Sequence, residues 1–217
     1  MMKRDLAIIK DLERFRVMSR NDIADIHFGH LKNPITNANI VLKRLARDGQ
    51  IEVGTDFRPY VYFPHGSKMK RNSTKIPHYL ELVNVYKQLK KYAEPKVFTV
   101  EVRYEKGLCE PDIFTIFKGT PFYIELQRNT YSQAVMDKKI KRYESLYYSG
   151  TIEKEPWQKA RKVFPYIIMI SDTRYEIKSD VLRVFQVPSI HDFMRSVAGE
   201  KREVRREQPR VISKRLV

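Results

Sequence analysis

The N-terminal part of the chain carries apolar stripes at helical spacing, separated by short turn signals. The first stripe predicts a helix over residues 5–15 and consists of Leu6, Ile9, Leu12 and Phe15. Ser19 and Asp22 form a capping-box pattern, which predicts that a short second helix begins here and ends near Gly29. A third helix is expected over residues 36–48, with its core-facing positions at Ile40, Val41 and Leu45.

Two short strands are predicted after the third helix, over residues 50–53 and 59–63, with residues 54–58 as the tip of a hairpin. This order of helices and hairpin, over residues 1–66, resembles the winged-helix variant of the helix-turn-helix. In that fold the third helix enters the major groove and the wing touches the DNA backbone. The resemblance implies that the DNA contacts come from Asn37, Asn39, Lys43, Arg44 and Arg47 on the helix and from Arg58 on the wing. Winged helices also dock proteins, so protein binding is the alternative use of this module.

A segment without periodicity, residues 67–77, is predicted to be a basic linker between two domains. It contains no acidic residue, and its Lys68, Lys70 and Arg71 are candidates for nonspecific contact with phosphates. Residues 78–194 then favour a second domain with helices over 78–92 and 132–148 and a short helix from 189. Its strands are expected over 97–104, 113–117, 121–126, 166–170 and 182–187. The fold class is therefore α/β (α+β), followed by a basic tail over residues 195–217.

Candidate chemistry lies where two of these strands adjoin. Asp112 follows Pro111 at the start of one strand, and Glu125 lies in the next, so the carboxylates are expected to converge across the hairpin. Carboxylate oxygens suit Mg²⁺ or Mn²⁺, which would activate a water molecule for attack on a phosphate. Gln127 shares the face of Glu125. The spacing and the α-β-β-β-α-β-β order resemble the PD-(D/E)xK superfamily, the restriction-endonuclease-like fold, in which a Lys usually stands at the position of Gln127.

The sequence offers further candidates for this site. A third metal ligand is expected from the preceding helix at Glu81, with Glu101 as a weaker choice, although a surface glutamate on a helix is commonplace. Lys139 and Tyr143 lie four residues apart on the polar helix and so share a face. Either Lys139 or Lys141 could replace the missing lysine. The alternative is a basic helix that covers the DNA backbone.

Net charge narrows the class of partner. The chain of 217 residues has 42 Lys and Arg against 26 Asp and Glu, a formal charge of +16, which favours a polyanion as partner. Its single cysteine, Cys109, excludes an intramolecular disulfide. Without a signal-peptide pattern or an apolar run long enough to cross a bilayer, the sequence predicts a soluble, cytoplasmic protein with no membrane partner.

A closer resemblance joins these segments. The predicted winged helix and basic linker precede Pro111-Asp112, Glu125, Gln127 with Arg128-Asn129-Thr130, and a helix bearing Lys139, Ile140 and Tyr143. This arrangement resembles the replication-relaxation family of plasmids, phages and mobile elements, in which an acid is common where Gln127 stands. The resemblance implies a protein that binds double-stranded DNA in replication or relaxation, with Mg²⁺ or Mn²⁺ as cofactor if it cleaves. A non-catalytic transcriptional regulator on a degenerate nuclease scaffold is the alternative. A homodimer is compatible with this resemblance, and so is a protein partner in replication or regulation.

Overall fold

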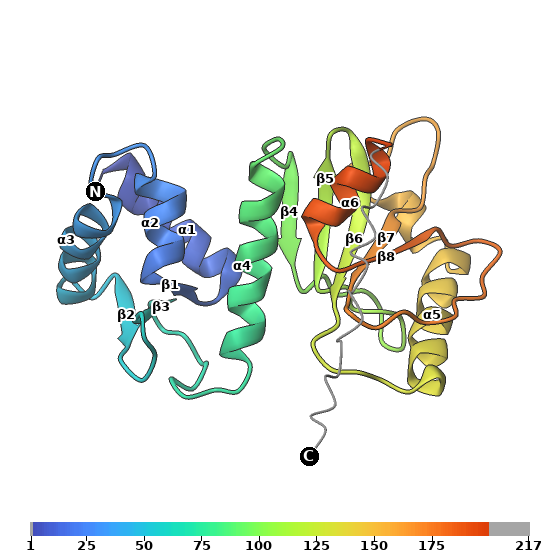
Figure 1. Cartoon of the computed structure of the whole chain (residues 1–217), viewed down its shortest axis with the longest axis horizontal. Coiled ribbons are helices and arrows are strands. Elements are labelled where there is room, and N and C mark those ends of the chain that lie inside the picture. Colours follow the sequence, from blue (N-terminus) through green and yellow to red (C-terminus); the bar gives the residue numbers. More distant parts are fainter. Residues whose placement is uncertain (1, 200–217) are drawn as a thin grey trace, which may run out of the picture.

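The structure is a computed structural model that describes residues 2–199, so nearly all of the predicted tail, 195–217, lies outside the described residues (Figure 1). Along the chain the N-terminal elements are α1 (Lys3–Phe15), β1 (Met18–Ser19), α2 (Arg20–Phe28), α3 (Pro34–Arg47), β2 (Ile51–Gly54) and β3 (Val61–Pro64). The remaining elements are α4 (Ile76–Lys90), β4 (Val97–Val100), β5 (Ile113–Phe117), β6 (Thr120–Leu126), α5 (Gln133–Tyr148), η1 (Thr151–Lys154), β7 (Tyr166–Ile170), β8 (Val184–Val187) and α6 (Ile190–Val197). The protein is mixed α/β, as predicted. Among residues 2–199, no helix is both long and apolar enough to cross a membrane.

The N-terminal helices pack on a three-stranded sheet of order β1-β3-β2. Ser19 caps α2 by accepting a hydrogen bond from the Asp22 amide, which confirms the predicted capping box. The short strand β1 was not predicted, because its two residues are held only by pairing with Val61 and Tyr62 of β3. The core-facing position predicted at Ile40 is wrong. The buried stripe of α3 is Ala38, Val41, Leu42 and Leu45, whereas Ile40 is 65% exposed.

The second sheet has five strands in the order β4-β5-β6-β7-β8. The pairs β4–β5 and β5–β6 are antiparallel, and α5 connects β6 to its parallel neighbour β7. Lys118 and Gly119 form the β5–β6 turn with φ angles of 48° and 80°, the positive values that a tight two-residue hairpin needs. This turn sets the register in which Ile113 lies opposite Ile124, and so places the residues before β5 beside the end of β6.

Each face of this sheet has its own helical cover. Ile113, Ile124 and Leu126 belong to the core shared with α4 and α6, whereas Phe114 and Tyr123 belong to the core shared with α5. Figure 1 shows α4 standing between the N-terminal helices and the sheet, with α5 on the far side of the sheet. The alternation of side chains along β5 and β6 therefore sends every second residue toward α5, and Glu125 follows Tyr123 in that direction.

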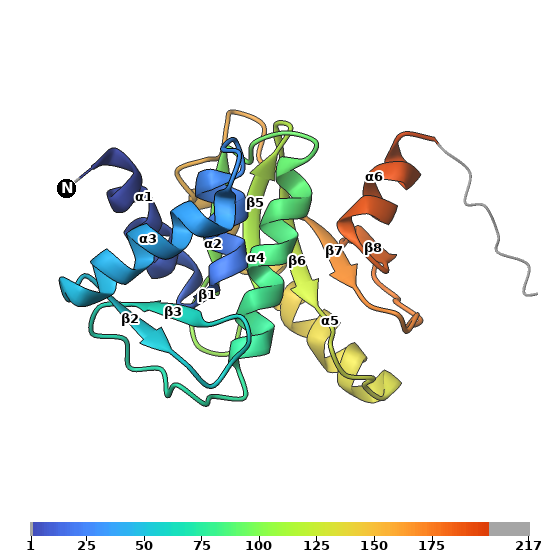
Figure 2. The same ribbon diagram turned by 60° about the vertical axis from the view of Figure 1, so that its left-hand side comes forward.

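One apolar core crosses the predicted boundary between residues 66 and 78. Phe15 of α1 lies 5.5 Å from the ring of Tyr86 on α4 and 5.8 Å from Phe98 on β4. Lys87 of α4 adds ion pairs with Asp22 and Asp25 of α2, at 2.8 and 2.7 Å. Figure 2 shows α2 alongside α4 from a second side. The N-terminal helices thus pack directly onto α4. Of the predicted linker, residues 67–75 form a loop, whereas Ile76 and Pro77 already belong to α4, with Ile76 fully buried in the core.

Candidate active site

Asp112 and Glu125 come together at the end of the β5–β6 hairpin. Asp112 immediately precedes β5, and its Oδ2 accepts a hydrogen bond of 2.8 Å from the backbone amide of Leu126, the last residue of β6. Glu125 is the neighbouring residue of that strand and is only 2% exposed. The antiparallel register therefore brings the two predicted carboxylates to the same corner of the sheet.

Asp112 is paired with a histidine that the sequence did not single out. His78, in the first turn of α4, places its Nε2 3.3 Å from Asp112 Oδ1. Burial raises the pKa of Asp112, but the hydrogen bonds from His78 and from the Leu126 amide outweigh it and leave the pKa lowered. The hydrogen bond to Asp112 in turn raises the pKa of His78. The pair thus favours an ionised aspartate and shifts the imidazole toward its protonated form.

Glu125 contacts two residues of α5. Its Oε2 lies 2.6 Å from the Lys139 ammonium, and its Oε1 accepts a hydrogen bond from the Tyr143 hydroxyl. Lys139 and Tyr143 share one helix face, as predicted, and that face is turned toward the carboxylate. Burial raises the pKa of Glu125 to about 7, against the opposing pull of Lys139. Burial lowers the pKa of Lys139, but Glu125 outweighs it and leaves that pKa raised, so the lysine stays charged.

Gln127 follows β6 and is 9% exposed. Its amide nitrogen donates a hydrogen bond of 2.5 Å to the carbonyl of Asn129, which ties the side chain to its own loop. Asp112, Gln127 and Lys139 line a cleft of about 680 Å³, together with residues from the loop before α4 and from the loop after β6. The cleft is thus bordered by the predicted linker on one side and by the predicted site on the other.

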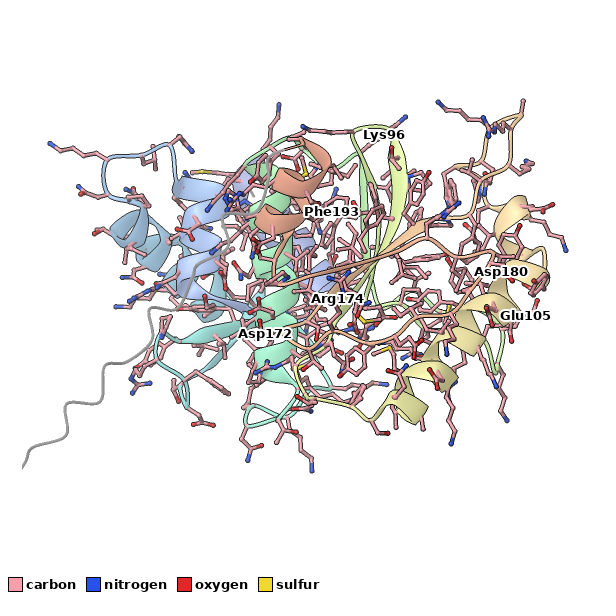
Figure 3. All side chains as sticks on the ribbon, turned by 45° about the vertical axis from the view of Figure 1, so that its right-hand side comes forward. Lys96, Glu105, Asp172, Arg174, Asp180 and Phe193 are labelled. Atoms are coloured by element: carbon pink, nitrogen blue, oxygen red, sulfur yellow. The ribbon has the colours of Figure 1, made fainter. Side chains whose placement is uncertain are left out.

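Glu81, the predicted third ligand, is placed differently. It accepts a hydrogen bond of 3.0 Å from Asn84 and lines a neighbouring hollow of about 280 Å³ with Asp172. Figure 3 shows Asp172 and Arg174 nearer α4, and Asp180 and Glu105 toward α5. Within residues 2–199 no three His, Cys, Asp or Glu side chains gather closely enough to hold a metal ion. Asp112, Glu125 and Glu81 therefore do not form a three-residue ligand set.

Glu101, the weaker candidate, connects the cleft to the N-terminal helices. Its carboxylate accepts a hydrogen bond of 2.5 Å from Tyr79 and pairs with Arg16 at 2.9 Å. Its backbone amide donates to the carbonyl of Asp112 at 2.8 Å. Glu101 and Arg16 both have positive φ angles, 50° and 66°, which non-glycine residues rarely adopt. Glu101 thus supports Asp112 and is itself held from outside the sheet.

The residues predicted to contact DNA fall into two groups. Four are exposed, and their side chains take part in no ion pair or hydrogen bond among residues 2–199: Asn39, Lys43, Lys68 and Lys70. The other five are engaged by the protein. Arg44 pairs with Asp5 at 2.9 Å, Arg47 with Asp48 at 2.9 Å, and Arg71 with Glu52. Asn37 donates to the Asn33 carbonyl at 2.8 Å, and Arg58 donates to carbonyls of its own hairpin.

His78 and the hydroxyl of Tyr143 are the site residues that sequence reasoning missed. Tyr143 was placed on the right face of α5 but was not assigned a carboxylate partner. The pairing of His78 with Asp112 spans 34 positions of the chain, and no local pattern marks it. The only signal was a histidine in the first turn of α4, next to the buried Ile76 and Tyr79.

The His78–Asp112 pair has a measurable pH signature. We expect the pKa of His78 to lie above the usual value of about 6.5, and to fall in Asp112→Asn, where the charged partner is gone. Because the folded-state pKa is raised, the pair stabilises the fold fully below the unfolded pKa and loses this effect as pH rises through the raised value. NMR titration of the histidine ring protons measures the shift, with the exposed His30 as internal control. An unchanged His78 pKa in Asp112→Asn would contradict the pairing.

Comparison of the chain with protein-family models, curated proteins and solved structures gives no match. A function must therefore be argued from the geometry of the chain itself.

Proposed function

We propose that this chain is a DNA-binding protein of a plasmid- or phage-type element, acting in DNA replication or relaxation, and that the site at Asp112 and Glu125 cleaves DNA with Mg²⁺. The observation that carries the proposal is the position of Lys139, whose ammonium lies 2.6 Å from Glu125. A PD-(D/E)xK site needs two carboxylates and one nearby cation. Lys139 supplies from α5 the charge that is lacking at Gln127.

The N-terminal part supports the DNA-binding half of the proposal. Its three helices and its sheet of order β1-β3-β2 support the proposed winged helix, in which α3 would enter the major groove. Asn39 and Lys43 on α3 are exposed, as base and phosphate contacts must be. The exposed Lys68 and Lys70 extend the basic surface into the loop that precedes the cleft. Duplex DNA bound by α3 would thus continue toward the candidate active site.

Asp112 and Glu125 fit a small divalent cation by the chemistry of their oxygens. Mg²⁺ is commonly held by one or two carboxylates together with water and substrate phosphate, so a third protein ligand is not required. The lowered pKa of Asp112 keeps this ligand ionised, and Glu125 becomes ionised as pH rises through about 7. When bound, the metal would lower the pKa of a water molecule and neutralise charge on the phosphate.

The protein's own groups have distinct parts in such a reaction. Lys139 has a raised pKa, so it acts as a fixed positive charge for the phosphate and not as a base. Glu125, which becomes ionised as pH rises through about 7, would serve as the second carboxylate ligand of the metal. Tyr143 holds the other oxygen of Glu125 and so orients the carboxylate. Gln127, bonded to the Asn129 carbonyl, keeps the loop after β6 in place.

A second candidate function is a non-catalytic regulator that uses the nuclease-type domain as a scaffold. The observation that favours it is that every carboxylate oxygen of Asp112 and Glu125 already has a hydrogen-bond or ion-pair partner within the chain. Asp112 contacts His78 and the Leu126 amide, and Glu125 contacts Lys139 and Tyr143. In this alternative the two ion pairs hold β5, β6, α4 and α5 together, and no metal enters.

Incubation with supercoiled plasmid in Mg²⁺ or Mn²⁺ separates the two functions. We expect the chain to nick the plasmid, and Asp112→Ala and Glu125→Ala to lose at least about 100-fold in rate, since each removes a proposed ligand. Glu105→Ala, which removes an exposed carboxylate outside the cleft, is the matched control and should retain the rate. Absence of nicking, with DNA affinity unchanged in both variants, would favour the scaffold.

DNA affinity itself is measured in the same preparations without divalent ions. Each phosphate contact made by a lysine or arginine contributes about −0.9 to the slope of log K against log salt. We therefore expect a steep loss of affinity as salt rises. A flat response would contradict the DNA-binding half of the proposal, whatever the outcome of the nicking assay.

A further inference from the structure

The cleft contains a group of residues that metal-dependent cleavage alone does not explain. Tyr131, Lys75 and Arg128 line it beside Asp112 and Lys139. Neither Lys75 nor Arg128 takes part in a salt bridge within residues 2–199, and both are exposed. The cleft thus holds two cations without acidic partners and one aromatic ring, in addition to the paired His78 and Lys139.

Tyr131 is held in place by its backbone. Its amide donates a hydrogen bond of 2.8 Å to the hydroxyl of Tyr175, which is only 6% exposed and belongs to the core under α5. The next residue, Ser132, caps α5 by accepting from the amide of Val135. The ring of Tyr131 nevertheless remains 40% exposed. A tyrosine anchored on both sides of its backbone and open at its ring is suited to stack against a flat ligand.

The size of the cleft limits what can enter it. A volume of about 680 Å³ lies within the range of roughly 300–1,000 Å³ typical of sites that enclose one small ligand. One nucleotide is a ligand of that size, whereas a base pair with both of its backbones is not. A DNA strand that inserts a nucleotide into this cleft would be unpaired at that nucleotide.

We propose that the cleft binds an unpaired nucleotide of a DNA strand, with its base stacked on Tyr131 and its flanking phosphates between Lys75 and Arg128. Aromatic rings combined with basic side chains are how single-stranded nucleic acid is bound without sequence preference. This inference rests on the proposed DNA-binding function and names its substrate class: duplex that α3 contacts, next to a stretch of single strand at the cleft. Lys139 and Asp112 then lie beside the phosphate that follows the stacked base.

Binding without metal tests the inference separately from cleavage. The probe is a fluorescein-labelled oligothymidylate of about 15 nucleotides, near the upper span of a single-strand site. Its affinity is measured by fluorescence anisotropy in EDTA and compared with that of a duplex of equal length and of a single strand with abasic sites throughout. The variants are Tyr131→Ala, Tyr131→Phe and, as matched control, Tyr148→Ala, which removes a ring that is 72% exposed outside the cleft.

We expect Tyr131→Ala to weaken single-strand binding about tenfold, in line with the loss of one stacked base. Tyr131→Phe should retain the affinity because the ring is kept, and Tyr148→Ala should match the unchanged protein. The abasic strand has no base that could stack on the ring, so its affinity should be the same for the unchanged protein and for Tyr131→Ala. Equal single-strand affinity of Tyr131→Ala and Tyr148→Ala, with duplex binding intact, would overturn the nucleotide site alone. Absence of binding to every DNA would overturn the proposed function with it.

Discussion

Replacement of Lys139 by Met is expected to destabilise the protein by about 1.4 kcal/mol at pH 8, one pH unit above the pKa of Glu125 in the unchanged protein. The cause is Glu125, whose carboxylate is 3% exposed and would keep only the Tyr143 hydroxyl as partner. Burial already raises the pKa of Glu125 to about 7, and loss of the lysine removes the main group that lowers it. Glu125 would then bind a proton more strongly and remain neutral to higher pH.

This mechanism makes the loss of stability depend on pH in a definite direction. At pH 6 the protonated Glu125 of Lys139→Met carries no charge, so the variant should lie close to the unchanged protein. Between pH 7, near which Glu125 ionises in the unchanged protein, and the higher pKa of Glu125 in the variant, each pH unit adds about 1.4 kcal/mol to the difference. Urea unfolding at pH 6, 7 and 8 measures the trend. The neighbouring exposed Lys138→Met is the control and should show no pH-dependent difference.

A second substitution distinguishes stability from chemistry. Glu125→Gln in the Lys139→Met background removes the unpaired charge and should recover most of the stability lost at pH 8. Nicking should stay abolished, because the proposed ligand and the cation are both absent. An equal loss of stability at pH 6 and pH 8 in Lys139→Met would contradict this mechanism. It would show that the stability comes from packing of the aliphatic part of the Lys139 side chain and not from its charge.

Phe15→Ala should cause the largest loss of stability outside the site, about 3–5 kcal/mol. Phe15 is fully buried, and its ring packs against Tyr86 of α4 and Phe98 of β4, which also contact each other. The cavity would therefore open at the junction of the N-terminal helices with α4 and the five-stranded sheet. We expect thermal unfolding to remain one transition whose midpoint falls by roughly 10 °C.

The same helix supplies the control for this prediction. Leu6→Ala removes a side chain of α1 that is 46% exposed, and its midpoint should change little. Two separate transitions in Phe15→Ala, with only one shifted, would show that the N-terminal helices fold as an independent unit. A single shifted transition would show that the core shared across residues 66–78 makes unfolding cooperative.

Local patterns predicted the elements but not how they meet. The helix start at Ser19 followed from capping chemistry, and the structure shows the same cap at Ser132 and Ser189, where the helices were predicted to begin. The strand predicted over residues 97–104 ends at Val100 because Glu101 adopts a positive φ of 50°. Apolar alternation cannot reveal such a backbone turn, since the side chains beyond it keep the same spacing.

The same limit applies to the candidate site: the sequence pattern predicted some of its residues, and tertiary packing determined the others. Asp112 and Glu125 were placed together from one hairpin, because adjacent antiparallel strands fix their neighbours within a few residues. Lys139 was one of two lysines considered, and only the packing of α5 on the sheet selects it. His78, Glu101 and Arg16 meet around Asp112 through the packing of α1 and α4, which depends on a core that spans both predicted domains. That packing has no signature in short-range sequence.

The most direct test of the proposed site is a crystal of the full chain grown with Mn²⁺ above pH 7, where Glu125 is ionised. We expect an anomalous difference peak between the carboxylates of Asp112 and Glu125, with His78 displaced from Asp112, and no peak in Asp112→Asn. An unoccupied corner in which His78 still contacts Asp112 and Lys139 still contacts Glu125 would contradict metal-dependent cleavage and leave the pairs as a scaffold.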